Sequence, residues 1–366
     1  MMRCARRLWT PVFVTALALA GAALPAEEPT PAPAESPAPP PARIEVTGFV
    51  DVFYEYSFNR VDPAFRAFDI HHNAFSLSLA DLAFAEPVGP ENRLGFRVDL
   101  NFGETADLVA ALEPEENGQE IYKHFQQAYL SLLTGRVQWD VGRFVTPIGA
   151  EVIESQDNWN YTRSILFGYA IPFNHTGLRA AVPVGDRVSL TAFLLNGWNN
   201  GSDLAGDKTV ALGAIVKPRP SLSVSATYMG GREVDQGDVR HLFDTTLSVG
   251  VSSRLTLMGN FDYGREGDTR WWGLAGYAKL QAAPGWSLAG RYEVVDDANG
   301  GFMLLGTRAR SVTVTSDHLV AGGLKARLEY RTDFADAPVF PRHDGTPGKT
   351  QTTLTAGVVY GFNRRF

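Results

Sequence analysis

The sequence predicts an all-β chain that closes into a transmembrane antiparallel β-barrel of about sixteen strands. Three observations predict it: apolar residues recur at every second position, tight turns alternate with long connections, and the last segment alternates up to a terminal aromatic residue. Residues of one parity on a strand face one way. In a membrane barrel the apolar parity faces lipid and the polar parity faces a wet lumen.

The N-terminal region predicts export from the cytoplasm. In residues 1–26 three arginines precede an apolar run, and the small residue Ala26 stands before the predicted cleavage site. This order is typical of a secretory signal peptide. Residues 27–43 are mostly proline and alanine, so they cannot bury a core and are interpreted as an extended tether. Residues 44–366 remain for the transmembrane β-barrel.

The charge and the cysteine content exclude several classes of protein. The chain has 33 basic and 40 acidic residues, and loss of residues 1–26 leaves 30 basic and 40 acidic ones, a net charge of −10. Such an acidic chain is no candidate for nucleic-acid binding. The single cysteine, Cys4, lies in the predicted signal peptide, so the mature chain is expected to lack disulfides and thiol chemistry. No apolar run reaches 18 residues, which argues against a transmembrane helix.

The alternation defines the strands one after another. It is clearest in residues 221–228, where Leu222, Val224, Ala226 and Tyr228 alternate with serine and threonine. The predicted strands are residues 44–58, 73–85, 94–102, 125–133, 137–144, 175–184, 188–196, 209–218, 222–230, 241–251, 255–264, 271–281, 286–295, 309–319, 324–334 and 350–366.

The connections between these strands favour a barrel over other β folds. Short and long connections strictly alternate in the predicted pattern, and the longest spans residues 145–174. Short periplasmic turns and long extracellular loops are typical of outer-membrane barrels, in which an even strand number returns both termini to the periplasmic rim. A soluble sandwich also alternates, but its polar face meets bulk water. A β-propeller would repeat a blade motif, and the sequence contains none.

The last strand supports closure of the barrel. Leu354, Ala356, Val358, Tyr360 and Phe362 share the parity of terminal Phe366, and only Arg364 interrupts this series. Such a strand needs a partner, and in a closed barrel the first strand supplies it. The alternative is an ordinary edge strand of a soluble sheet.

Three stretches resemble a known family. They are GFVDVFYEYSFNR at residues 48–60, LGFRVDLNFGETA at residues 94–106, and the segment from QAYLSLL to FNHTGLRA at residues 127–180. They resemble the OmpL-like β-barrel porins, a family of the outer membrane of Gram-negative bacteria. The resemblance implies a passive diffusion channel for small hydrophilic solutes or ions, without catalytic residues or cofactors. It leaves the solute open, and it does not explain the proline-rich tether.

The same resemblance implies partners. These are outer-membrane lipid and lipopolysaccharide, and the barrel-assembly machinery, which is expected to read Phe366 as an assembly signal. General porins are usually homotrimers, but nothing in the sequence marks a subunit interface, so monomer and homotrimer both stay open.

The polar parity predicts which charged residues line the lumen. Acids prevail in the first five strands and bases in strands twelve to fifteen. Such separated walls would create a transverse field across the pore; the alternative is that the charges pair with one another. The predicted lumen wall includes Asp51, Glu55, Arg97, Asp99, Arg291, Lys325, Arg327 and Arg331.

The 145–174 connection is the best candidate for a functional site. Loops of this length are usually functional or disordered, and this one contains an apolar patch at residues 165–167 that favours burial. Folding into the barrel would bury the patch and form a constriction; the alternative is an external loop that packs on its neighbours. The candidate constriction residues are Glu151, Glu154, Asp157 and Arg163.

The sequence gives little support for an enzyme. Its seven histidines occur without an HExxH motif, and it has no GxSxG motif, so we assign no catalytic or metal-binding residues. Two alternatives to a channel remain: a structural or adhesive outer-membrane barrel with a closed lumen, and, with less support, an outer-membrane lipid-acting enzyme.

Overall fold

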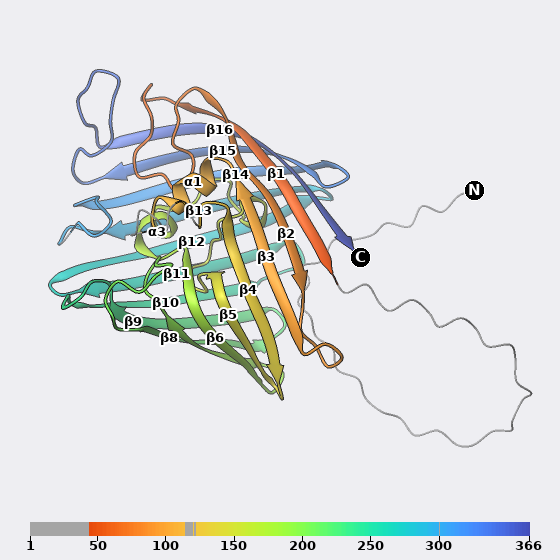
Figure 1. Cartoon of the computed structure of the whole chain (residues 1–366). Coiled ribbons are helices and arrows are strands. Elements are labelled where there is room, and N and C mark those ends of the chain that lie inside the picture. Colours follow the sequence, from red (N-terminus) through yellow and green to blue (C-terminus); the bar gives the residue numbers. More distant parts are fainter. Residues whose placement is uncertain (1–43, 114–119, 121, 300) are drawn as a thin grey trace, which may run out of the picture. The chain divides into compact units, whose positions relative to one another are not determined.

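The computed structural model describes residues 44–113, 120, 122–299 and 301–366. Within them, sixteen strands form one closed antiparallel barrel in which every strand pairs with its neighbours in sequence and β1 pairs with β16 (Figure 1). The predicted fold class and the strand number are confirmed. The predicted signal peptide and tether, residues 1–43, lie outside the described residues.

The strand bounds agree with the predicted segments to within a few residues. The strands are β1 Glu45–Ser57, β2 Ala74–Glu86, β3 Leu94–Phe102, β4 Phe125–Thr134, β5 Val137–Val145, β6 Asn174–Val184, β7 Val188–Leu195, β8 Thr209–Arg219, β9 Leu222–Arg232, β10 Val239–Gly250, β11 Leu255–Glu266, β12 Thr269–Ala283, β13 Trp286–Asp296, β14 Arg308–Ala321, β15 Leu324–Ala335 and β16 Thr350–Arg365.

Short helices lie in the connections. They are α1 (Glu104–Ala110), the 3₁₀ turn η1 (Ser155–Asp157) and α3 (Ile165–Ala170). Ser164 caps α3 by accepting a hydrogen bond from the Phe167 N–H over 2.9 Å, which satisfies one of the free N–H groups at the start of a helix. None of the described helices is long and apolar enough to cross a membrane.

One connection departs from the predicted alternation of short and long. Residues 267–268 join β11 to β12 as a two-residue turn, although every other connection on this rim has at least six residues. Both strands continue further than their apolar alternation does, and Gly267 adopts the left-handed conformation, with a φ of 57°, that a tight hairpin turn requires. Strict alternation was therefore wrong at this connection.

The barrel closes through the first and last strands. β1 and β16 pair antiparallel from Glu45 opposite Arg365 to Ser57 opposite Thr353. The ladder continues past both strands, because Ile44 and Phe366 exchange backbone hydrogen bonds of 3.1 and 2.9 Å. Closure leaves no unpaired strand edge, as a membrane-embedded sheet requires.

The two faces of the wall differ in chemistry. Apolar side chains point outward, and Phe75, Leu130 and Leu212 are 88%, 70% and 64% exposed. Polar side chains such as Thr353 and Thr355 point inward and are buried. This is the opposite of a soluble fold and the distribution that a lipid environment stabilises.

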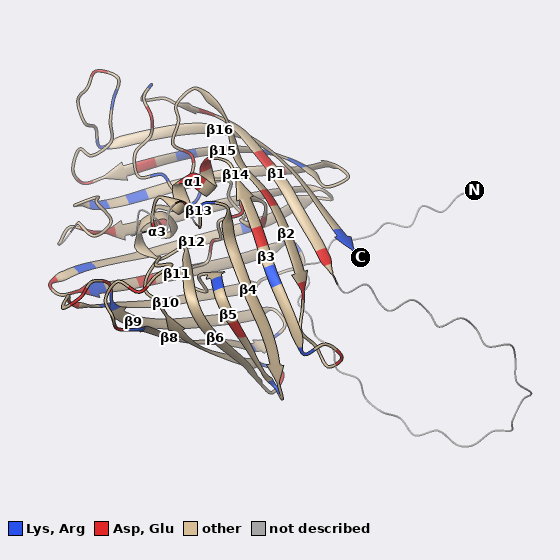
Figure 2. Cartoon of the chain, in the orientation of Figure 1, with Lys and Arg blue, Asp and Glu red and all other residues tan. Residues whose placement is uncertain are grey.

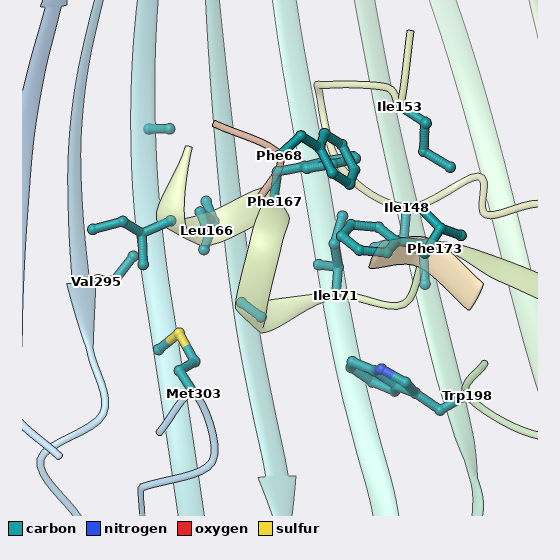
Figure 3. Close-up of a cluster of buried hydrophobic side chains, with 14 of the residues drawn as sticks. Phe68, Ile148, Ile153, Leu166, Phe167, Ile171, Phe173, Trp198, Val295 and Met303 are labelled. Atoms are coloured by element: carbon teal, nitrogen blue, oxygen red, sulfur yellow. The ribbon is translucent and has the colours of Figure 1, made fainter. Parts of the chain in front are cut away.

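The hydrophobic core lies inside the barrel and is supplied by connections. Around α3, Leu166 and Phe167 pack with Phe68, from the β1–β2 connection, and with Phe173 (Figure 3). Inward-facing Trp271 of β12 is buried and donates from its indole N–H to the carbonyl of Ala170 over 3.0 Å. The interior is therefore packed against α3 and is not an empty cylinder at this level.

Candidate pore constriction

The connection between β5 and β6, residues 146–173, folds into the barrel and is held by charged side chains of the wall. Glu329 of β15 accepts hydrogen bonds from the N–H groups of Tyr161 and Thr162 over 2.5 and 3.0 Å. Glu293 of β13 accepts from the N–H groups of Ile165 and Leu166, each over 3.1 Å. These carboxylates take the place of secondary-structure partners for the loop backbone.

Basic side chains on the same side bind the carbonyl groups of the loop. Arg327 donates to the carbonyls of Ser155 and Asn158 over 2.5 and 3.0 Å, and Lys325 donates to the carbonyl of Gln156 over 3.0 Å. Hydrogen bonds of charged groups are stronger than neutral ones. The loop is consequently tied to β15 through donors and acceptors of its own backbone.

The loop is also held by β1, which lies across the β1–β16 seam from β15. Asp51 of β1 accepts from the hydroxyls of Ser155 and Tyr161 over 2.6 and 2.8 Å. The anchors of residues 146–173 described here thus come from β1, β13 and β15. We call these three strands the anchoring wall.

Two of the four candidate constriction residues are buried in this arrangement. Glu151 pairs with Arg291 over 2.6 Å and accepts from the Ser164 N–H over 2.9 Å. Arg163 donates to the carbonyl of Tyr161 over 2.7 Å and to that of Ile153. That all four residues line a passage stays a prediction, and Glu151 and Arg163 are engaged in contacts within the loop and with the wall.

The other two candidates are more accessible. Asp157 is exposed, and Glu154 is half-buried and accepts from the Gln126 side-chain amide over 2.6 Å. Restricted contact with water inside the barrel raises the pKa of both carboxyls above their ordinary values. Lys325 and Arg327 oppose this effect at Asp157. Of the four candidates, these two keep the most contact with solvent, Asp157 more than Glu154.

The predicted lumen-wall residues all face inward, but most of them are paired. Asp51, Glu55, Asp99, Arg291, Arg327 and Arg331 are buried, whereas Arg97 and Lys325 are partly exposed.

Their partners are nearby carboxylates or loop groups. Arg97 pairs with Asp99 over 2.9 Å, and Arg331 pairs with Asp333 over 2.8 Å. Glu55 accepts from the Thr355 hydroxyl over 2.9 Å. Acidic and basic positions occur on the same strands, as on β3 in Figure 2. The contacts thus agree with paired charges more than with two walls of opposite sign.

The β1–β2 connection supplies residues that the sequence analysis did not single out. Arg66 is buried and pairs with Asp69 over 2.8 Å and with Asp333 of β15 over 3.0 Å. The Phe68 ring lies 5.0 Å from the guanidinium of Arg163. The repeated phenylalanine in AFRAF at residues 64–68 could have indicated that this connection is buried, because such a pattern is unusual in a solvent-exposed loop.

Aromatic side chains pack near the rim that carries the long loops. The rings of Trp271 and Phe302 stack with a centroid distance of 3.5 Å, and Trp198 meets both edge-on. The Arg240 guanidinium lies 5.0 Å from the rings of Trp198 and Phe302. The connections after β7 and β13 therefore pack together against Trp271 of β12.

No metal site stands out. Among the residues that the structure describes, no group of three or more His, Cys, Asp and Glu side chains converges as metal ligands would. The described interior is instead dominated by Arg–carboxylate pairs and loop contacts.

Solved structures of outer-membrane channels share this fold. The outer membrane channel DcaP of Acinetobacter baumannii is 12% identical, covers 87% of this chain and 97% of its own, and has a TM-score of 0.60. The anion-selective porin from Comamonas acidovorans is 13% identical, covers 87% of this chain and 99% of its own, and has a TM-score of 0.60. OmpT of Vibrio cholerae in its trimer form is 10% identical, covers 87% of this chain and 99% of its own, and has a TM-score of 0.56. No curated protein sequence matches the chain.

A family profile matches most of the chain. The family is described as Putative beta-barrel porin-2, OmpL-like, and the match spans residues 43–362, which is nearly the whole barrel. It agrees with the closed sixteen-strand barrel and with the resemblance noted in the sequence. The chain therefore belongs to this OmpL-like porin family and is a porin of the bacterial outer membrane.

Proposed function

We propose that this porin is a passive diffusion channel whose constriction is set by residues 146–173, with Glu154 and Asp157 as the carboxylates that meet the solute. The observation that carries the proposal is the attachment of the loop inside the barrel, mainly to the anchoring wall and also to Gln126 of β4 and Trp271 of β12. Because the loop is held inside the barrel, small hydrophilic solutes or ions must pass beside it. Its accessible charges then act on them at short range.

The accessible charges favour cations over anions. A carboxylate acts more strongly on a nearby ion in a narrow, low-dielectric passage than in bulk water. Lys325 and Arg97 counter this preference, but Lys325 is tied to the carbonyl of Gln156 and Arg97 to Asp99. We therefore expect a weak preference for cations.

Planar bilayers test the proposal. The folded protein is expected to give discrete conductance steps, and a salt gradient should give a reversal potential that indicates cation preference. The double variant Glu154→Gln, Asp157→Asn should lose this preference with little change in conductance, since amides and carboxylates have similar sizes. The loss of cation preference should be largest at low salt, where the charges are screened least.

A matched control separates local from general charge effects. Asp235→Asn and Asp344→Asn remove two carboxylates from the long extracellular connections and should leave the reversal potential unchanged. An unaltered reversal potential in the Glu154, Asp157 variant would place both carboxylates outside the constriction.

A closed-lumen structural or adhesive barrel is the second candidate. The observation in its favour is the buried hydrophobic cluster inside the barrel. Protein whose folding is verified by heat-modifiable gel mobility, yet which stays silent at high load in bilayers, would support this candidate and contradict the channel. The fold and the family favour a non-enzymatic role, and a lipid-acting enzyme has no further support.

The assembly state belongs to the same proposal. OmpT of Vibrio cholerae, which shares the fold, has been solved in a trimer form. We infer a homotrimer for this chain, embedded among outer-membrane lipid and lipopolysaccharide after insertion by the barrel-assembly machinery. Native mass spectrometry in mild detergent should then give three times the mass of the mature chain, and a monomer mass alone would contradict the inference.

A further inference from the structure

Two aspartates on neighbouring strands face each other in the interior. Asp244 of β10 and Asp262 of β11 are direct partners in the antiparallel register. Both side chains are shielded from solvent, with exposed fractions of 1% and 0%. Directly opposed residues bring their Cβ atoms to within about 5 Å. Two carboxyl groups are thus held side by side in a dry environment.

This pair lacks the partners that other buried acids of the wall have. Neither carboxylate oxygen of Asp262 nor Oδ1 of Asp244 has a hydrogen-bond partner of good geometry; the polar groups that face the pair are the opposing carboxyl, the Asn260 amide and the Gly149 backbone. The other oxygen of Asp244 accepts from the side-chain amide of Asn260 over 2.7 Å. Among the described residues, no Lys, Arg or His forms an ion pair with either aspartate.

Comparison with the anchoring wall shows how unusual this is. Buried Asp333 has two arginines as partners, Arg331 and Arg66, at 2.8 and 3.0 Å. Buried Glu329 accepts from two backbone N–H groups and from the Thr315 hydroxyl over 2.6 Å. A buried carboxylate without such compensation is strongly unfavourable. No basic side chain among the described residues neutralises Asp244 and Asp262.

The geometry points to a binding site for one calcium ion between Asp244 and Asp262. Three carboxylate oxygens of this opposed pair have no hydrogen-bond partner of good geometry. Ca²⁺ binds carboxylates in one- or two-oxygen modes and completes its shell with water or carbonyl oxygens. One divalent ion neutralises both side chains. Mg²⁺ fits less well, because it requires near-ideal octahedral geometry and gives up its water reluctantly.

The site borders the start of the constriction loop. Oδ1 of Asn260 accepts from the Ala150 N–H over 3.2 Å, and the backbone of Gly149 faces the Asp244 carboxylate. These contacts lie on β10 and β11, whereas most of the other anchors of the loop lie on the anchoring wall of β1, β13 and β15. A bound ion would fix the two aspartates against residues 149–150 and so hold the start of the loop against β10 and β11.

Calcium binding by the folded, chelator-treated full-length mature protein tests the site. Equilibrium dialysis with ⁴⁵Ca²⁺ should show one ion per chain bound above the background of the surface acids, with a Kd on the order of 0.1–1 mM, as in calcium sites with few protein ligands. Asp262→Asn and Asp244→Asn should each lose that one equivalent. Calcium should also raise the unfolding temperature of the wild type but not of these variants.

The control is Asp140→Asn, which removes another buried inward carboxylate of the wall, one that already pairs with Arg179 over 2.8 Å. It should keep the calcium equivalent. Equal calcium binding by wild type and Asp262→Asn would overturn the site.

A protonated-carboxyl infrared band in the calcium-free wild type that calcium does not remove, and that Asp262→Asn abolishes, would also overturn it. A shared proton would then neutralise the pair. None of these measurements depends on conductance, so the site and the proposed channel can fail separately.

Discussion

At the scale of single residues, the interior of this porin separates charges that hold structure from charges that a solute can meet. Glu151 and Arg291 form a buried pair, whereas Asp157 is exposed on the same loop. The sequence predicted their inward location from the parity of the strands and from the acidity of the loop. The sequence could not predict which of these charges are paired and which are accessible, because Glu151 and Arg291 are 140 positions apart in the chain.

Glu151→Gln should destabilise the protein. The substitution leaves the Arg291 guanidinium buried without its counter-charge, and breaking a buried pair in this way costs about 3–5 kcal/mol. Urea unfolding in detergent, followed by tryptophan fluorescence, measures the loss.

Asp157→Asn is the matched control, since exposed substitutions usually change stability by no more than about 0.5 kcal/mol. Equal unfolding midpoints for the two variants would show that the Glu151–Arg291 pair does not hold the loop.

Ion selectivity should depend on pH through Glu154 and Asp157. The pKa of each is raised by its surroundings, above the ordinary values of 4.5 and 3.8, so protons bind at a higher pH than they would to free side chains. Cation preference should therefore decline as the pH falls, and the decline should begin at a higher pH than ordinary carboxyl groups would give.

Reversal potentials recorded at successive pH values measure this decline. The Glu154→Gln, Asp157→Asn variant should lack the corresponding part of the change. If wild type and variant change in parallel, other acids control the pH response.

At the scale of elements, alternation predicted the strands well and the connections less well. Each strand buries one parity and exposes the other, so its location follows from local sequence. The interior path of residues 146–173 depends instead on Glu293, Glu329 and Arg327, which lie on strands far along the chain. The apolar patch at residues 165–167 indicated burial, but α3 and its Ser164 cap were not predicted.

Deletion of Phe366 should slow barrel assembly. Its backbone exchanges two hydrogen bonds with Ile44 at the seam, and its side chain is 70% exposed on the outer surface. The deletion removes the last rung of the closing ladder together with the expected assembly signal. Pulse-chase measurement of heat-modifiable, folded protein in the outer membrane quantifies the rate.

Phe366→Tyr serves as the control for this deletion, because it keeps an aromatic ring and the backbone pair. It should assemble at close to the wild-type rate. Wild-type kinetics for the truncated chain would exclude an assembly role for Phe366.

At the scale of the whole molecule, the arrangement of the anchors sets an order for assembly. Hydrogen bonds from residues 161 and 162 to Glu329 join positions 168 and 167 apart in the chain, and contacts of such long range form late because the intervening chain must first be ordered. β13 and β15 must be in place before residues 161–166 find their partners. The β1–β16 seam joins still more distant positions, so we expect the contacts of the loop with Asp51 of β1 to form last, together with closure of the barrel.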